Sequence, residues 1–262
     1  MFRPLPLFSD PLDCPSWAVF LDFDGTLVEI ADRPEDIVVP AALPVALGAL
    51  GTAFGGAVAI VSGRTIDVID GFIGGAVPAV AGLHGWERRD LSGARTHAAA
   101  ELPNLDHARQ HLKSLTEKFP GVLIEDKGAS LAIHYRHEPL AAAACHAAAV
   151  EVVEAANGAL VTLDGKCVVE VKATVADKGA AVRAYLREPP FAGRRPVYIG
   201  DDVTDEAGFK AVVAAQGIAV AVGERAADPA TAATAYLPDV SAVHAWIGTA
   251  ARNAHKDSEI GT

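Results

Sequence analysis

Cysteine is scarce in this chain, which has three among its 262 residues, at positions 14, 145 and 167. They are far apart, odd in number and without Cys-x-x-Cys spacing, which argues against both a disulfide framework and a zinc site. A reducing compartment suits such a chain, so we expect a cytoplasmic protein. The N-terminal segment MFRPLPLFSDPLD also lacks a continuous apolar stretch, so we expect no signal peptide.

Positive charge is also in short supply, because 22 Lys and Arg stand against 33 Asp and Glu, a net charge of −11. A surface this acidic repels a phosphate backbone, so we expect no nucleic-acid partner. An anionic small substrate is still compatible with it, because a local basic cluster can outweigh the mean charge. Hydrophobic residues make up 51% of the chain, enough for a substantial core in one large domain or in two domains.

One uncharged stretch, residues 40–63, is long enough to suggest a membrane span. It contains Pro44 and several glycines, and its periodicity changes partway. The leucines from Leu43 to Leu50 recur at helical spacing, whereas residues 57–61 have the pattern of a buried strand. We therefore predict a helix, a loop and a strand here, and no membrane partner.

Strands and helices alternate over the first hundred residues and again from residue 177. The predicted strands cover 18–21, 57–61, 79–81, 196–200 and 218–222, and the predicted helices cover 41–50, 65–73, 177–186 and 206–215. This alternation is typical of a parallel sheet with helical crossovers. The predicted fold class is therefore α/β, with a Rossmann-like core.

The pattern changes between residues 101 and 173. Helical segments at 102–119 and 139–157 alternate with a strand-like segment at 123–136 and a hairpin at 160–171 that turns at Asp164-Gly165. The order αββαββ indicates a compact α+β domain inserted into the core. We therefore predict a core of residues 1–100 and 174–262, and a smaller domain of residues 101–173.

Two carboxylates, one residue apart, follow the first buried strand. Asp22 and Asp24 stand in the sequence Asp-Phe-Asp-Gly-Thr directly after Trp17–Leu21. Open α/β sheets bind ligands outside the carboxyl ends of their strands, and side chains at i and i+2 share a side, so both can face one centre. Gly25 allows the sharp turn that follows. An EF-hand loop would need its glycine two positions later, and a buried strand does not precede such a loop.

Three further polar segments follow or begin elements of the core. They are Ser62-Gly63-Arg64 after residues 57–61, Lys178 at a helix start, and Gly200-Asp201-Asp202-Val203-Thr204-Asp205 after the strand at 196–200. Each alone is commonly a turn or a helix cap. Together with the Asp-Phe-Asp segment, in this order, they indicate phosphoryl transfer.

Each segment has a task in that chemistry. Asp22 would attack phosphorus and form an aspartyl phosphate, while Asp24 would protonate the leaving oxygen and later take a proton from water. Ser62 and Lys178 would hold the phosphoryl oxygens, mainly by compensating their charge.

Bringing an anionic nucleophile to an anionic phosphate requires a cation, and the oxygen-rich segments suit Mg²⁺. The expected protein ligands are Asp22, the backbone carbonyl of Asp24, and Asp201. Asp202 and Asp205 are expected to orient metal-bound water and Lys178.

The four segments resemble the motifs of the haloacid dehalogenase-like phosphatases. DFDGT is similar to the first motif, Ser62 to the second, Lys178 to the third and GDDVTD to the fourth, over nearly the whole core. The insert between the second and third motifs resembles, in position and in αββαββ order, the C2-type cap of sugar phosphatases. The resemblance implies an enzyme with a catalytic core and a mobile cap.

Longer segments resemble the trehalose-6-phosphate phosphatases of that superfamily. They are LDFDGTLVEI, IVSGR, AGLHGWERR, HYR, KGAAV and GDDVTDE, with EDKG and GKCVVEV in the cap. The resemblance implies Mg²⁺-dependent hydrolysis of trehalose 6-phosphate to trehalose and phosphate, the last step of trehalose biosynthesis. It implies a sugar phosphate as the partner, and we expect a monomer.

In that family a cap strand with the pattern Lys-x-x-x-Glu contacts substrate, which corresponds here to Lys166 and Glu170. A glutamate can accept sugar hydroxyl hydrogens, and a lysine can donate to a ring or hydroxyl oxygen. The expected substrate-binding residues are Ser62, Gly63, Arg64, His84, Lys127, Arg136, Lys166 and Glu170. The chain departs from the family pattern at Lys172-Ala173 and at Asp177, where Arg-Pro and Asn are frequent, so the contacts near Lys172 stay unassigned.

Three alternatives stay open. The same chemistry could act on sucrose 6-phosphate, on mannosyl-3-phosphoglycerate or on another sugar phosphate. A phosphomutase would return the phosphate to the sugar instead of to water. A sugar-phosphate sensor without catalysis is the third alternative, and the intact Asp22, Asp24, Lys178 and Asp201 argue against it.

Overall fold

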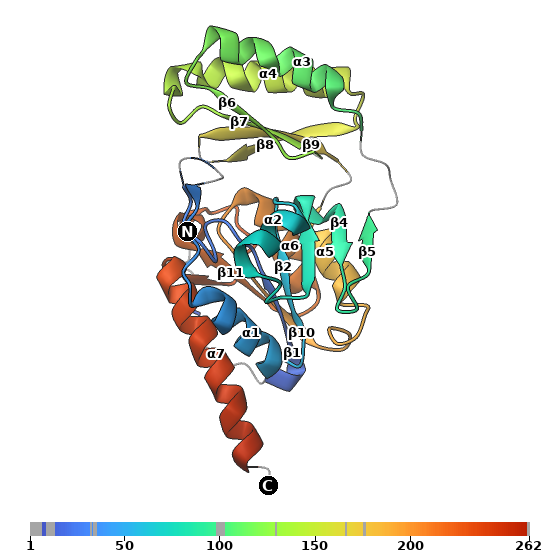
Figure 1. Cartoon of the computed structure of the whole chain (residues 1–262), viewed down its shortest axis with the longest axis vertical. Coiled ribbons are helices and arrows are strands. Elements are labelled where there is room, and N and C mark those ends of the chain that lie inside the picture. Colours follow the sequence, from blue (N-terminus) through green and yellow to red (C-terminus); the bar gives the residue numbers. More distant parts are fainter. Residues whose placement is uncertain are drawn as a thin grey trace. The chain divides into compact units, whose positions relative to one another are not determined.

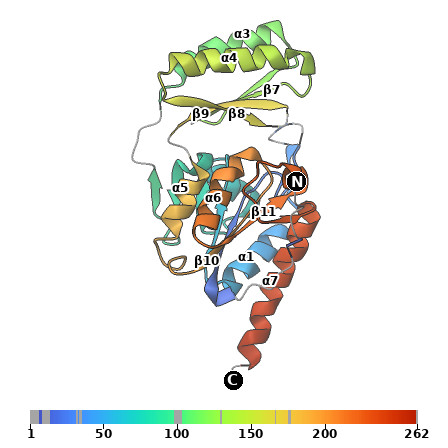
Figure 2. The same ribbon diagram turned by 180° about the vertical axis from the view of Figure 1, so that it is seen from behind.

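The structure is a computed structural model that describes residues 7–8, 14–31, 33, 36–97, 103–128, 130–165, 167–174 and 177–260. The chain forms two compact units, Met1–Thr96 with Lys178–Thr262, and His97–Asp177. Figures 1 and 2 show the elements of each unit from opposite sides. The domain boundary predicted after residue 100 lies outside the described residues. Within the described part of the chain, no helix is long and apolar enough to cross a membrane.

The first unit is built on a sheet in which eight strands are described, in the order β12-β11-β10-β1-β2-β3-β4-β5. The parallel strands are β1 (Trp17–Leu21), β2 (Val58–Val61), β3 (Ala79–Gly82), β10 (Arg195–Gly200), β11 (Ile218–Val222) and β12 (Ala235–Leu237). β4 (Glu87–Arg89) pairs antiparallel with β3, and β5 (Arg95–His97) lies next to it. The α/β fold with a parallel core is therefore confirmed.

Helices cover both faces of this sheet. They are α1 (Leu43–Ala53), α2 (Ile66–Ile73), α5 (Lys178–Tyr185), α6 (Glu206–Ala214) and α7 (Val240–Ile260), with short 3₁₀ turns at Cys14–Ser16, Leu83–Gly85, Val203–Asp205 and Gly223–Ala227. Side chains alternate along β1, so Val19 and Leu21 pack toward α1, α2 and α7, whereas Ala18 and Phe20 pack toward α5 and α6. This double burial explains why β1 is apolar at every position.

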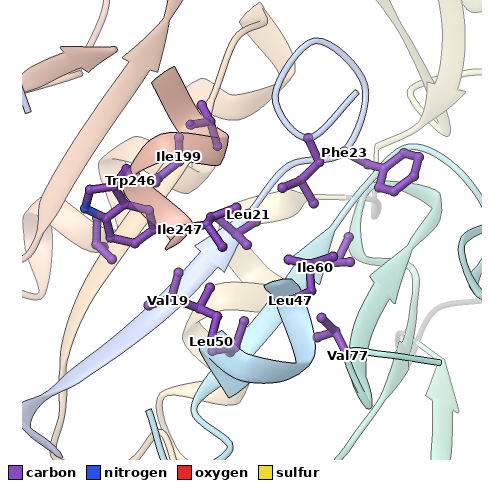
Figure 3. Packing of buried hydrophobic residues seen from close by; sticks show 14 of the residues in the cluster. Val19, Leu21, Phe23, Leu47, Leu50, Ile60, Val77, Ile199, Trp246 and Ile247 are labelled. Carbon is purple, nitrogen blue, oxygen red and sulfur yellow. The ribbon is translucent and has the colours of Figure 1, made fainter. Parts of the chain in front are cut away.

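Figure 3 shows the first of these two cores. Buried side chains from three strands and two helices meet there: Val19, Leu21, Ile60, Ile199, Leu47, Leu50, Trp246 and Ile247. Burying one large apolar side chain of this kind stabilises a fold by about 1.5–3 kcal/mol. The core thus fixes the strands whose ends carry the polar motifs.

The carboxyl-terminal elements β12 and α7 were not among the predicted elements. β12 spans three residues, which is too short for a periodic pattern to indicate a strand. In α7 the apolar face contains Val243, Ile247 and Ala250, spaced four and three residues apart, which is helical spacing. A longer window over residues 240–252 would therefore have indicated this helix.

The second unit is an antiparallel sheet of strands in the order β6-β7-β9-β8, with α3 and α4 on one face. The strands are β6 (Leu123–Asp126), β7 (Ser130–His134), β8 (Leu160–Gly165) and β9 (Val168–Ala173). The helices are α3 (Asp106–Lys118) and α4 (Ala142–Ala155), the latter preceded by a 3₁₀ turn at Pro139–Ala141. Leu131, Ile133, Val169 and Val171 pack with the helices.

One detail of this unit differs from the prediction. The order αββαββ is confirmed, with β6 and β7 as the two strands within residues 123–136, but the hairpin predicted to turn at Asp164-Gly165 reverses later, because Gly165 still pairs with Val168. Cys167, with φ of 61°, occupies the left-handed conformation in this turn. Left-handed backbone favours glycine, which is why the sequence indicated the wrong position.

Candidate active site

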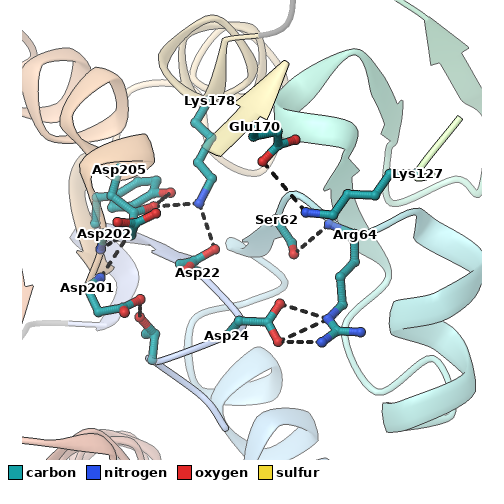
Figure 4. A network of polar contacts seen from close by, with 12 residues as sticks. Asp22, Asp24, Ser62, Arg64, Lys127, Glu170, Lys178, Asp201, Asp202 and Asp205 are labelled. Carbon is teal, nitrogen blue, oxygen red and sulfur yellow. Dashed lines mark hydrogen bonds and ion pairs between the residues drawn. The ribbon is translucent and has the colours of Figure 1, made fainter. Parts of the chain in front are cut away.

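The carboxyl ends of three neighbouring strands bring polar residues to one edge of the sheet. Asp22 follows β1, Ser62 follows β2 and Asp201 follows β10. The last residue of β1 is level with the penultimate residues of β2 and β10, so the residues that follow these strands lie close together. Lys178, the first residue of α5, reaches the same place (Figure 4).

Lys178 joins two of these acids by ion pairs. Its Nζ donates to Asp22 Oδ1 at 2.8 Å and to Asp205 Oδ1 at 2.7 Å. All three side chains are buried. A buried ammonium is stable only with such partners, so the position of Lys178 is fixed by the two carboxylates.

Asp205 is the residue that organises this network. Besides Lys178, its Oδ1 accepts from the hydroxyl of Tyr198 at 2.7 Å, and its Oδ2 accepts from the backbone N–H groups of Asp201 at 3.1 Å and Asp202 at 3.0 Å. The carboxylate thus ties α5 to the turn after β10. A side chain at Gly200 would displace it, because a Cβ there would lie 2.4 Å from Asp205 Cγ.

Tyr198 was missed by the sequence reasoning, which assigned Val197-Tyr198-Ile199 to a buried strand. Its ring is buried in the core beside Gly208, where a Cβ would lie 2.6 Å from the ring, while its hydroxyl reaches Asp205. A buried tyrosine hydroxyl needs a polar partner. A tyrosine two residues before the acidic segment that needs a polar partner was the signal in the sequence that could have identified Tyr198.

The charges in this cluster do not balance. Burial and the charge of Asp205 raise the pKa of Asp22 to about 7, although Lys178 opposes the shift. Burial, followed by the charges of Asp22 and Asp205, raises the pKa of Asp201 well above its usual range. For Lys178 burial acts to lower the pKa, but the charges of Asp205 and Asp22 outweigh it and the pKa is raised. The ammonium group of Lys178 therefore has to compensate the negative charges of several acids at once.

A cation would correct this imbalance, and the geometry offers it ligands. Asp22, Asp201 and Asp205 each place a carboxylate oxygen within 4.8 Å of the others. Both oxygens of Asp205 already accept hydrogen bonds from the protein, which leaves Asp22 and Asp201 as the better ligands. Thr26 Oγ1 donates to Asp201 Oδ1 at 3.3 Å. This set of oxygens fits a hard cation such as Mg²⁺.

Asp202 has a different environment. Its side chain accepts the backbone N–H of Asp205 and so caps the 3₁₀ turn that leads into α6. Burial, with the charge of Asp205, raises the pKa of Asp202. The carboxylate therefore lies beside the predicted metal ligand Asp201 and already holds the turn that carries it.

Asp24 faces away from Lys178 and toward Arg64 (Figure 4). Arg64 Nε donates to Asp24 Oδ2 at 2.7 Å and to Oδ1 at 3.0 Å, and Nη2 donates to Oδ1 at 2.7 Å. The backbone N–H of Arg64 donates to Ser62 Oγ at 3.0 Å. Arg64 thus connects the second polar segment to the first.

His84, a predicted substrate-binding residue, packs against this loop. Its backbone N–H donates to the carbonyl of Ser62 at 2.9 Å, and its own backbone is left-handed, with φ of 55°. The imidazole lies over Gly63, where a Cβ would come within 2.8 Å of the ring. His84 therefore supports the loop that carries Ser62.

The remaining predicted substrate-binding residues belong to the second unit. Lys127 Nζ lies 3.6 Å from Glu170 Oε2 and 3.9 Å from Glu125 Oε2. Glu170 is buried on β9, and Arg136 is partly buried just after β7. Lys166 lies outside the described residues.

Comparison with known proteins identifies the family. The trehalose-phosphatase family model matches residues 20–241. A probable trehalose-phosphate phosphatase of Sinorhizobium fredii is 41% identical over 239 residues, 91% of this chain and 89% of the relative. A trehalose-6-phosphate phosphatase of Escherichia coli is 38% identical over 245 residues, 92% of this chain and 89% of the relative.

Solved structures agree in fold. The C-terminal domain of a Candida albicans trehalose-6-phosphate phosphatase superposes with a TM-score of 0.81 at 22% identity, over 95% of this chain and 98% of that domain. A haloacid dehalogenase-like hydrolase of Bacteroides thetaiotaomicron superposes with a TM-score of 0.61 at 15% identity, over 88% of this chain and 98% of that protein. With this fold, and with a family model that covers most of its length, the chain belongs to the trehalose-phosphatase family.

Proposed function

We propose that this protein hydrolyses trehalose 6-phosphate to trehalose and inorganic phosphate, as the last step of trehalose biosynthesis. The observation that carries the proposal is the buried pair of Asp22 and Lys178 at the strand ends, in a chain of the trehalose-phosphatase family. The geometry supports phosphoryl transfer. Trehalose as the sugar of the substrate is inferred from the relatives, which are named as trehalose-phosphate phosphatases.

The site is proposed to work with Mg²⁺. Asp22, the backbone carbonyl of Asp24, and Asp201 would hold the ion, which supplies positive charge against the incoming phosphate and the acidic cluster. The raised pKa values of Asp22 and Asp201 support this assignment, because they show where compensating charge is lacking. Asp205 would act indirectly, by holding Lys178 and the turn that carries Asp201.

Asp22 is the proposed nucleophile. One of its carboxylate oxygens forms a bond to phosphorus while the bond between phosphorus and the sugar oxygen breaks, which gives an aspartyl phosphate. Asp24 gives a proton to the departing sugar oxygen. In the second step Asp24 takes a proton from water, the water oxygen bonds to phosphorus, and the bond to Asp22 breaks to release phosphate.

Ser62 and Lys178 are proposed to hold the phosphoryl oxygens. The Ser62 hydroxyl oxygen accepts from the backbone of Arg64, which leaves its O–H to donate to a phosphoryl oxygen. Lys178 is fixed by two carboxylates and so requires little reorganisation as charge develops on the phosphoryl group. Gly63 and His84 keep the Ser62 loop in place.

Sugar recognition is assigned to the unit of residues 97–177, which we propose acts as a cap. Glu170 would accept hydrogens from sugar hydroxyls, and Lys127, Lys166 and Arg136 would donate to sugar or phosphate oxygens. Lys127 already pairs with Glu170 and Glu125. A hydroxyl-rich ligand can replace such contacts one for one, whereas a small aryl phosphate cannot.

The decisive experiment is Asp22→Asn assayed by phosphate release with Mg²⁺. We expect turnover to be abolished and substrate binding, measured calorimetrically, to be retained, because the amide is a poor nucleophile. Asp70→Asn is the matched control, since Asp70 forms an ion pair with Arg89 in the same unit. Unchanged turnover in Asp22→Asn would eliminate the covalent route.

A panel of substrates tests the sugar. Trehalose 6-phosphate should be hydrolysed with the highest kcat/KM, ahead of sucrose 6-phosphate and mannosyl-3-phosphoglycerate. Equal values across the panel would leave a phosphatase of broader specificity. An isomerised sugar phosphate without release of free phosphate would indicate a phosphomutase instead.

A further inference from the structure

Asp24, the proposed proton donor, is held on both of its oxygens by a single side chain. The guanidinium of Arg64 donates through Nε to both Oδ atoms and through Nη2 to Oδ1, at 2.7–3.0 Å. The Arg64 side chain is 12% exposed and that of Asp24 is 36% exposed. A two-pronged, partly buried pair of this kind fixes orientation as well as charge.

The proton-transfer task assigned to Asp24 conflicts with this pairing. Both oxygens of Asp24 are occupied by the guanidinium, so neither is available for a hydrogen bond to the sugar oxygen while the pair is intact. The pair must therefore part, at least on one oxygen, during each catalytic cycle. An arginine that pairs with a carboxylate outside the proposed site would not have to release that carboxylate during turnover.

We propose that Arg64 is a positioning residue for Asp24, which it holds in a set orientation between turnovers and releases to the sugar oxygen when substrate is bound. This inference rests on the proposed function, because it takes Asp24 to be the acid and base of the reaction. The sequence-based expectation placed Arg64 among the substrate-binding residues and gave it the task of orienting the site or cap, whereas this inference names Asp24 as the group that it orients.

Arg64 is built to stay in place. Its backbone N–H donates to Ser62 Oγ, and its carbonyl accepts from the backbone of Leu83 at 3.0 Å. Its guanidinium lies over the ring of Phe72, 5.4 Å from the ring centre. Phe72 stacks on Phe23, the residue between the two aspartates, with ring centres 5.9 Å apart. The arginine is thus fixed to the two polar segments that it connects.

Arg64 also acts on the charge around the nucleophile. Asp24 places a carboxylate charge two residues from the proposed nucleophile Asp22. A guanidinium bonded to Asp24 offsets that charge next to the place where a phosphate dianion must approach. Without Arg64, Asp24 would be both less ordered and less compensated, so both effects slow turnover.

A double-mutant cycle tests the proposal on trehalose 6-phosphate with saturating Mg²⁺. We expect Arg64→Gln to lower kcat on the order of tenfold with KM within about twofold, because it disturbs the position of a group and not the binding of substrate. Asp24→Asn should lower kcat by roughly 10²–10⁴-fold. In the Asp24→Asn background, Arg64→Gln should have less than a twofold effect.

The opposite pattern would overturn the proposal. If Arg64→Gln raises KM and its effect is undiminished in the Asp24→Asn background, Arg64 contacts the substrate directly. If Arg64→Gln leaves kcat unchanged, the pair has no role in turnover. If Asp24→Asn itself leaves kcat unchanged, the proposed chemistry fails instead, so the two failures are distinguishable.

Two further variants separate positioning from folding. Arg88→Gln is the matched control, because Arg88 makes a two-pronged pair with Glu188 at 2.6 and 2.8 Å and also lies over an aromatic ring, Tyr185. It should leave kcat and KM unchanged. Phe72→Leu keeps the Arg64–Asp24 pair but removes the ring beneath the guanidinium, and it should lower kcat about twofold to fivefold with KM unchanged. An unchanged kcat in Phe72→Leu would count against the proposal.

Discussion

A methyl group added at Gly25 should greatly reduce activity while the protein stays folded. Gly25 has φ of +76°, and a Cβ there would lie 2.0 Å from Asp201 Oδ2 and 2.3 Å from Asp201 Cγ. The backbone of the first motif therefore touches the carboxylate of the fourth. Gly25→Ala would place a carbon atom where a proposed Mg²⁺ ligand now lies.

The cost divides into two parts. An alanine in left-handed backbone costs about 1 kcal/mol of folding stability. The clash is with the end of a side chain, so the protein stays folded and the Asp201 carboxylate moves instead. To restore a contact of 3.0 Å or more, the carboxylate must shift by about 1 Å. A displacement of that size in an active site costs on the order of 100-fold in rate.

Gly75→Ala is the matched control. Gly75 has φ of +73°, and nothing lies within 4 Å of a Cβ built there. Both variants should lose about 1 kcal/mol in chemical denaturation, but only Gly25→Ala should lose turnover, by about 100-fold, in phosphate release from trehalose 6-phosphate. The reasoning is refuted if the two variants have the same kcat, or if Gly25→Ala loses activity only by unfolding.

Three further predictions concern Tyr198, the bound cation and Glu170. Tyr198→Phe removes a hydrogen-bond donor from Asp205, so kcat should fall about tenfold with KM unchanged. The control Tyr185→Phe loses only a hydrogen bond to the Arg89 carbonyl and should keep full activity. Equal losses of kcat in the two variants would contradict a role of Tyr198 through Asp205. Burial and Asp205 raise the pKa of Asp22 from 3.8 to about 7, so the folded metal-free protein keeps a proton that the unfolded chain releases, and this group's contribution to stability falls as pH rises from about 4 to 7. The increase in Tm caused by Mg²⁺ should therefore be larger at pH 8 than at pH 5, and equal increases would argue against a cation at Asp22. Glu170→Ala should raise KM for trehalose 6-phosphate about tenfold and leave hydrolysis of 4-nitrophenyl phosphate within twofold; equal loss on both substrates would rule out a sugar-reading role.

The sequence was sufficient to predict where the site residues meet, because one physical rule connects strand order to position. Asp22, Ser62 and Asp201 each follow an apolar segment, and parallel strands end at one edge of the sheet. Lys178 required only that a helix begin at that edge. Their meeting point follows from periodicity and chain order, without any knowledge of side-chain conformation.

The pairing within the site could not be predicted in that way. Nothing in the spacing of Asp24 and Arg64, forty residues apart, indicates that the two form an ion pair rather than both facing substrate. The same holds for Tyr198. Its buried ring fits the apolar pattern of a strand, and the pattern does not indicate that its hydroxyl donates to Asp205. Which donor pairs with which acceptor depends on the side-chain groups that the backbone leaves close together without a partner. That is a property of the folded molecule.

These pairings give the acids of the candidate site different environments. Asp205 has four hydrogen-bond donors from the protein, and Asp24 has the guanidinium of Arg64. Asp22 and Asp201 are left with too little positive charge for their burial, and their raised pKa values follow from that. A site built only to be stable would compensate all four acids. Since Asp22 and Asp201 lack compensating charge, whereas Asp24 and Asp205 are paired with protein donors, the proposed cation would stabilise the protein mainly through Asp22 and Asp201.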